Sequence, residues 1–145
     1  LYGCNPTPGQ PNPMHQVVTL EGKILQIRGI DAPQSVGYGA TYRVTGPGRI
    51  ATVGVGYADG YLRSLSNKGR AFAQGVALPL VGRVSMDLTT FDISALADGS
   101  LKPGDWVELI GENVTLDEVG HTAGTIGYEI LTDLGRRYHR VYEDA

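Results

Sequence analysis

The chain has 145 residues and a formal net charge of -3, with 41% hydrophobic and 19% charged residues. This length predicts one domain with a real core, and the composition excludes a disordered tail. The slightly acidic balance argues against a broad nucleic-acid surface, and no apolar run approaches the ~18 residues of a membrane span. Because its one cysteine, Cys4, excludes an internal disulfide, we expect a reducing, cytoplasmic location.

The beginning of the chain differs in composition from the rest. Four prolines fall within residues 5–14, and proline fixes φ and removes backbone donors, so neither a helix nor a central strand is expected there. The chain also opens without an initiator Met or a charged-then-apolar leader. We therefore expect residues 1–14 to be an extended linker from a preceding part of a longer polypeptide, with the domain itself spanning residues 15–145.

Short strands dominate the pattern that follows the linker. Apolar residues alternate with polar ones along residues 18–27, which predicts the first strand. Gly-Pro-Gly at residues 46–48 and Lys-Pro-Gly-Asp at residues 102–105 predict turns. Further strands are expected at residues 40–44, 49–56, 70–74, 78–85, 88–93 and 106–110.

Helical signals appear only near the C-terminal end. Thr115 and Glu118 predict a capping box, in which the threonine hydroxyl accepts from the helix backbone and the glutamate reaches back. This helix should end near Gly124. Apolar residues at helical spacing within residues 125–134 predict a second helix that Gly135 stops in the left-handed conformation.

Residues 137–142 are expected to form a closing strand. The sequence thus predicts a mainly β fold: an antiparallel β-barrel-like domain with one or two short helices near the C-terminus. Closure of such a barrel protects edge strands from pairing with other chains.

Candidate catalytic groups are sparse. The histidines His15, His121 and His139 are not spaced as metal ligands, and no adjacent motif pairs Cys4 with a histidine. The glycines also lack the spacing of phosphate-binding loops. No self-sufficient catalytic set is therefore evident in the sequence.

Tyrosines flanked by glycine are the remaining signal. The chain has eight tyrosines, and Tyr38, Tyr57 and Tyr128 each have a glycine beside them. Small neighbours let a ligand or another surface approach the ring and its hydroxyl. The same pattern also fits aromatic rings packed in a barrel core with glycines in the turns. A phenol with a pKa of ~10 serves as a base near neutral pH only where positive charge or hydrogen bonds favour the phenolate.

Four segments in fixed order resemble the C-terminal half of alanine racemases, and the resemblance covers essentially the whole chain. They are SVGYGATY at 35–42, VGYADGY at 55–61, VGRVSMD at 81–87 and AGTIGYE at 123–129. The resemblance implies a fold-type III enzyme that uses pyridoxal 5'-phosphate (PLP). It also implies an N-terminal (β/α)8 barrel that holds PLP on a lysine, and a homodimer in which the C-terminal β domain completes the partner subunit's site.

The implied reaction interconverts L- and D-alanine, which bacteria use in peptidoglycan synthesis. The resemblance assigns Tyr38 as the base on one face of the substrate, opposite the cofactor lysine. It assigns the backbone N–H of Met86 to the substrate carboxylate and the hydroxyl of Tyr128 to the cofactor phosphate. The residues implied to line the channel to the site are Tyr57 at its inner gate and Arg63, Arg83 and Ile126 further out.

The chain departs from the family pattern mainly by what it lacks. Gly37 stands where the family often has serine, and neither the cofactor lysine nor the barrel is present. PLP is therefore not expected to be bound to this fragment, and the fragment alone is expected to be inactive. Three alternatives remain: a broad-specificity amino-acid racemase of the same fold, a PLP decarboxylase that uses a cysteine, and a non-catalytic β-barrel interaction module.

Overall fold

The computed structural model describes residues 2–7, 9–31, 33–36 and 42–143. Two short 3-10 helices, η1 (Tyr57–Asp59) and η2 (Arg63–Leu65), and two α-helices, α1 (Leu116–Ala123) and α2 (Gly127–Asp133), accompany the strands. The strands are β1 (Leu20–Ile30), β2 (Gln34–Val36), β3 (Tyr42–Val44), β4 (Gly48–Val53), β5 (Arg70–Ala73), β6 (Val76–Pro79), β7 (Thr89–Asp92) and β8 (Trp106–Ile110).

Six of these strands form one antiparallel sheet in the order β6-β5-β8-β1-β4-β7. The two outer ends of the sheet approach each other, since Leu80 bridges Phe91 just beyond β6. The N–H of Val81 donates to the carbonyl of Thr90 at 2.9 Å, and the Thr90 hydroxyl donates back to the carbonyl of Val81 at 2.5 Å. This contact nearly closes the barrel and confirms the predicted mainly β fold.

The long strand β1 holds the barrel together because it pairs with two partners. Its first residues pair with β8 and its remainder with β4. The register shifts near Leu20 and again near Ile24, and such bulges bend a strand and increase its twist. Leu20 and Ile24 face the core, as the alternation in the sequence predicts.

The core lies inside this barrel. Phe91, Leu109 and Leu78 are fully buried, and Leu65 of η2 fills the same cluster. Burying a side chain of this size stabilises the fold by roughly 1.5–3 kcal/mol. The helix α1 packs against η2, so the helical end of the domain is anchored to the barrel.

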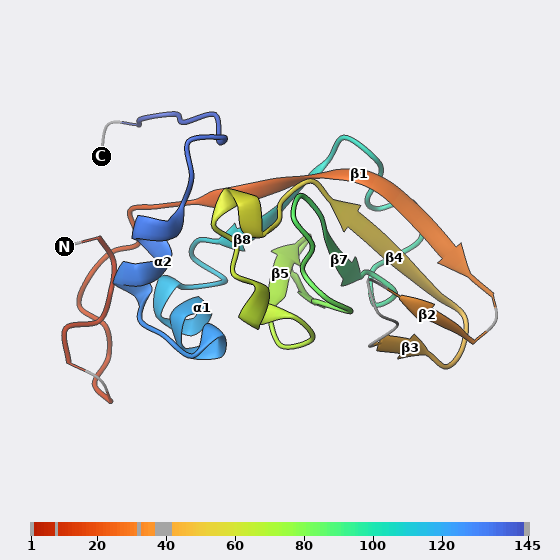
Figure 1. Ribbon diagram of the computed structural model, residues 1–145, viewed down its shortest axis with the longest axis horizontal. Coiled ribbons are helices and arrows are strands. Elements are labelled where there is room, and N and C mark those ends of the chain that lie inside the picture. Colours follow the sequence, from red (N-terminus) through yellow and green to blue (C-terminus); the bar gives the residue numbers. More distant parts are fainter. Residues whose placement is uncertain (1, 8, 32, 37–41, 144–145) are drawn as a thin grey trace.

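The two ends of the elongated molecule carry different elements (Figure 1). The helices α1 and α2 and the N-terminal segment lie at one end. The separate two-stranded sheet of β2 and β3 lies at the other. The hairpin is therefore an extension of the barrel rather than part of it.

The N-terminal segment is fastened to the helical end. Cys4 is buried, and burial is the main reason that the pKa of its thiol is raised. The N–H of Asn5 donates to the Asp117 carboxylate at 2.7 Å. The described part of residues 1–14 forms neither helix nor strand. The origin of this segment as a linker from another domain remains a prediction.

The predicted start and stop of α1 are largely confirmed. The hydroxyl of Thr115 accepts from the N–H of Glu118 at 3.2 Å, and Gly124 ends the helix with φ 83. The reciprocal arm of the capping box is wrong, because the Glu118 carboxylate binds Arg70 instead, at 2.5 and 2.6 Å. That ion pair ties α1 to β5.

Four predicted elements differ from the structure. The strand expected at 49–56 ends at Val53. The strand expected at 78–85 ends at Pro79, apart from the bridge at Leu80, and the chain then runs as a loop. The helix α2 ends at Asp133 and Gly135 is not left-handed; its N–H donates to the carbonyl of Asp59. Residues 137–142 form no strand, because the edges β6 and β7 already meet each other.

None of the helices in the described part of the chain is long and apolar enough to cross a bilayer.

Candidate functional site

Tyr38, the predicted base, lies outside the residues that the structure describes. The strands that flank it, β2 and β3, are paired in antiparallel register from Gln34 opposite Val44 to Val36 opposite Tyr42. Of the strand predicted at 40–44, the described part is β3, and residues 40 and 41 lie outside the described residues.

Tyr57 opens the 3-10 helix η1 on the rim of the barrel. The N–H of Gly56 donates to the Asp59 carboxylate at 2.9 Å, and Gly60 ends the turn with φ 91. The Tyr57 side chain is half-exposed, whereas Asp59 is only 6% exposed. The short helix thus presents the tyrosine outward and holds the carboxylate inside.

Met86 lies in a tight turn spanning residues 85–88. The N–H of Ser85 donates to the carbonyl of Leu88 at 2.9 Å, and the Ser85 hydroxyl accepts from the N–H of Leu88 at 3.2 Å. Met86 is half-exposed at the tip. Among the described residues, no acceptor binds the N–H of Met86, which leaves a backbone donor for a ligand.

Backbone hydrogen bonds join η1 to this turn. The N–H of Tyr57 donates to the carbonyl of Ser85 at 3.0 Å, and the N–H of Ala58 donates to that of Met86 at 2.9 Å. A Cβ on Gly56 would lie 2.5 Å from the carbonyl carbon of Met86. Glycine at this position is therefore required for the two segments to approach.

Arg63 and Arg83 come from a second pair of joined segments. The Ser66 hydroxyl accepts from the N–H of Val84 at 3.0 Å, and the Asn67 side chain accepts from the N–H of Gly82 at 2.6 Å. Both arginines are exposed. The structure thus places Arg63 at the start of η2 and Arg83 on the loop that joins it, next to the segments that carry Tyr57 and Met86.

Ile126 and Tyr128 lie at the start of α2, and both are exposed. The other end of this helix meets η1: a Cβ on Gly60 would lie 2.5 Å from the carbonyl carbon of Asp133. Within the part of the chain that is described, the Tyr128 hydroxyl has no hydrogen-bond partner. The same helix therefore presents a free phenol and braces the loop of Tyr57.

An ion-pair network that the sequence analysis missed links these segments. Arg137 binds the buried carboxylate of Asp59 at 3.2 Å through Nε and that of Asp87 at 2.8 Å through Nη1. Its bond to Asp87, with the charge of Asp59, raises the pKa of the guanidinium. Asp59 and Asp87 lie within two of the motifs quoted in the sequence analysis, and this position was the signal that could have pointed to them. Arg137 was not considered as a site residue because residues 137–142 were predicted to form a strand.

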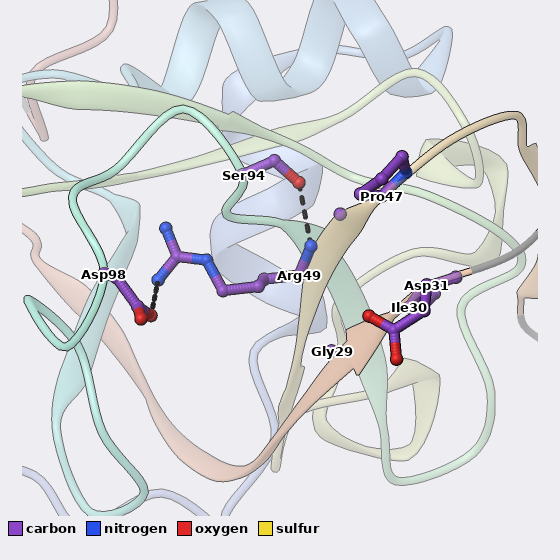
Figure 2. Close-up of a pocket in the computed structure, with 8 residues that line it drawn as sticks. Gly29, Ile30, Asp31, Pro47, Arg49, Ser94 and Asp98 are labelled. Carbon is purple, nitrogen blue, oxygen red and sulfur yellow. Dashed lines mark hydrogen bonds and ion pairs between the residues drawn. The ribbon is translucent and has the colours of Figure 1, made fainter.

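A shallow hollow of about 360 Å³ lies elsewhere, at the base of the hairpin, lined by Gly29, Asp31 and Arg49 among others (Figure 2). Figure 2 shows Arg49 held by Ser94 and Asp98. Its guanidinium also donates to the carbonyl of Ala97 at 3.3 Å. With these donors used internally, the hollow offers little to a ligand.

In the described ranges no group of three or more histidine, cysteine or acidic side chains could hold a metal ion. The candidate site is thus a rim of loops with exposed tyrosines, arginines and a free backbone donor.

Comparison with known proteins identifies the class of this domain. The sequence profile of the family described as "Alanine racemase, C-terminal domain" matches residues 17–142. The chain therefore belongs to the alanine racemase C-terminal domain family.

The similar proteins are considerably longer than this chain. It is 54% identical over 142 residues to an alanine racemase of Rhodospirillum rubrum, covering 98% of this chain and 38% of that protein. It is 55% identical over 145 residues to one of Acidiphilium cryptum, covering 40% of that protein. The chain thus spans about two-fifths of the length of these relatives.

Solved structures agree with the fold. An alanine racemase from Bartonella henselae with covalently bound pyridoxal phosphate superposes with a TM-score of 0.91 and 45% identity, covering 98% of this chain and 39% of that one. A biosynthetic alanine racemase from Pseudomonas aeruginosa superposes with a TM-score of 0.90 and 36% identity, covering 99% of this chain and 40% of that one.

Proposed function

We propose that this chain is the C-terminal domain of an alanine racemase that interconverts L- and D-alanine with PLP. In this proposal an N-terminal (β/α)8 barrel carries the cofactor lysine, and a second subunit completes each site. The supporting observation is family membership over residues 17–142, together with relatives that are alanine racemases and of which the chain spans about 38%.

When bound, PLP withdraws electrons from the substrate and makes its α-proton removable. The residues of this chain fit such a group at one position. Tyr128 is half-exposed, and its hydroxyl is unpaired among the described residues. A phenol hydroxyl donates to a phosphate oxygen without titrating. Tyr128 would therefore hold the phosphate.

In this proposal Tyr38 takes or returns the α-proton on one face of the substrate. Inversion of a carbon centre needs a group on each face within hydrogen-bond reach, and a lysine of the barrel serves the other. A phenolate near neutral pH needs cationic neighbours. The barrel of the partner subunit would supply them.

The rim residues would bind and admit the amino acid. The free N–H of Met86 would donate to the substrate carboxylate. Tyr57 would narrow the inner channel, and Ile126 would line its outer part. The exposed guanidiniums of Arg63 and Arg83 would attract the carboxylate toward the site.

The arrangement of elements supports a site shared between subunits. The strands flanking Tyr38 lie at one end of the long axis, and α2 with Tyr128 lies at the other (Figure 1). One copy of the domain is poorly placed to bring both groups to one substrate. In a homodimer, one copy would supply the end that carries Tyr38 and the other copy the end that carries Tyr128.

The test is the change Tyr38→Phe in the full-length protein that carries this chain. Turnover of both alanine enantiomers should fall about 10²–10⁴-fold, because a general base is lost, while the cofactor absorbance is retained. Tyr142→Phe is the matched control, since Tyr142 is 87% exposed, and it should leave turnover unchanged. Parent-like turnover by Tyr38→Phe would contradict the proposal, as would racemisation by the 145-residue chain alone with added PLP.

A further inference from the structure

Arg137 joins two parts of the rim that no strand connects. Its Nε lies 3.2 Å from Asp59 Oδ1, and its Nη1 lies 2.8 Å from Asp87 Oδ1. One guanidinium thus binds η1 and the turn at residues 85–88 together.

The Asp59 carboxylate is itself fixed to the backbone of its turn, and Asp87 is next to Met86 in the chain. The second oxygen of Asp59 accepts from the N–H of Gly56 at 2.9 Å, which shapes the turn that presents Tyr57. The carbonyl of Asp59 accepts from the N–H of Gly135 at 3.0 Å, so the segment carrying Arg137 is anchored close by. Asp87 directly follows Met86 at the tip of its turn.

We propose that Arg137 is a positioning residue: by binding Asp59 and Asp87 together, it sets the direction of the Met86 N–H relative to Tyr57. This inference rests on the proposed function, in which that N–H binds the substrate carboxylate. Arg137 itself does not touch the substrate.

How far the side chains of this ion-pair network are exposed determines whether losing Arg137 affects the turn at residues 85–88, the stability of the domain, or both. The Arg137 and Asp87 side chains are 54% and 53% exposed, and an exposed ion pair contributes little to overall stability. The Asp59 side chain is only 8% exposed, so removing its cation leaves a buried carboxylate without its ion-pair partner and lowers the free energy of unfolding. The hydrogen bonds of the turn at 85–88 to Tyr57 and Ala58 do not involve Arg137, so they are expected to remain when it is removed. Loss of Arg137 is therefore expected to loosen the turn and to lower stability, while the Gly56 N–H still binds the Asp59 carboxylate.

The geometry also predicts how a lysine would behave. Arginine reaches the two carboxylates with two different nitrogens, Nε and Nη1. A lysine ammonium is a single point charge on a flexible stem and does not reproduce this fork. Arg137→Lys should keep the attraction but lose part of the alignment.

The experiment compares Arg137→Ala, Arg137→Lys and the matched control Arg136→Ala in the full-length enzyme. Arg136 is an exposed neighbour without an ion pair in the described residues. Arg137→Ala should raise the KM for alanine about 10-fold with kcat within about 3-fold, because a binding donor is misdirected. Arg137→Lys should fall between Arg137→Ala and the parent, and Arg136→Ala should match the parent.

Hydrogen–deuterium exchange supplies a readout that needs no activity. Measured well below the thermal midpoints of all variants, exchange of the peptide spanning residues 85–88 should be faster in Arg137→Ala and unchanged in Arg136→Ala. Unchanged exchange, or faster exchange with an unchanged KM, would overturn the positioning role, as would an effect shared by Arg136→Ala. Failure of the proposed function is separate: an inactive parent or an active Tyr38→Phe enzyme overturns that function. The exchange result decides, independently of activity, whether Arg137 holds the turn at residues 85–88.

Discussion

At the scale of single residues, two tyrosines are placed where a phenolate is disfavoured. Tyr61 is 2% exposed, and the Tyr138 hydroxyl is buried without a hydrogen-bond partner. Burial is the largest cause that raises the pKa of both phenols well above its usual range, and neighbouring negative charge adds to it. Both side chains therefore stay neutral in the folded state at pH values where they ionise in the unfolded chain.

The free energy of unfolding should therefore be independent of these groups below about pH 10 and fall above it. Each raised phenol contributes a slope of up to about 1.4 kcal/mol per pH unit until the folded pKa is passed. Tyr138→Phe should remove the contribution of one phenol. The free energy of unfolding, measured by denaturant titration at each pH, should then fall less steeply between pH 9 and 11.

At pH 7 the same variant should change the free energy of unfolding by no more than about 1 kcal/mol, because the hydroxyl has no partner to lose. The exposed Tyr142→Phe serves as the control and should retain the parent slope. An unaltered alkaline slope in Tyr138→Phe would contradict the assignment.

At the scale of elements, the site depends on η1 being packed between a turn and a helix. Gly60 has φ 91, and a Cβ there would meet the carbonyl group of Asp133 at the end of α2. Gly75, in the turn between β5 and β6, has a similar φ of 79 with nothing within 4 Å. The two glycines thus share a backbone conformation but differ in their surroundings.

This pair separates backbone strain from steric contact. Gly75→Ala should cost about 1–2 kcal/mol, the penalty for a side chain in the left-handed region. Gly60→Ala should cost at least about 2 kcal/mol more, because α2 must move, and its yield of folded protein should fall. Denaturant midpoints measure both, and equal destabilisation would contradict the packing described for η1.

Sequence patterns predicted an element well where residues within that element or beside it determine its structure. Thr115 and Gly124 mark the start and the end of α1 as expected, because a helix cap depends only on residues within one turn of it. The strand predicted at 137–142 failed because strand formation needs an available edge, which alternation alone does not reveal. The helix end at Asp133 was likewise set by contact with η1 rather than by Gly135.

At the scale of the whole molecule, the domain nearly closes its barrel but leaves apolar side chains on its outside. Tyr57, Met86 and Leu88 on the rim, and Ile126 and Tyr128 at the start of α2, are all at least 40% exposed. Exposed apolar patches favour association. In the proposed enzyme, barrel domains would cover these residues.

The isolated 145-residue chain should therefore form dimers or larger oligomers in sedimentation experiments. The double change Tyr57→Ser with Leu88→Ser should weaken association, because it removes apolar area from the rim. Val141→Ser, in the exposed C-terminal segment, is the control and should not. A monomeric parent chain at high concentration would count against this expectation.

The sequence by itself determined the mainly β class, most strand positions, the start of α1 and, through four motifs, the family. These features arise from short-range causes: alternation, turn chemistry and side chains that cap a helix. Tertiary structure alone decided that β6 meets β7 and that α2 stops against Gly60. It also brought Asp59, Asp87 and Arg137 together. These contacts join residues distant in the chain, and their partners are set by how the barrel closes, which no local pattern encodes.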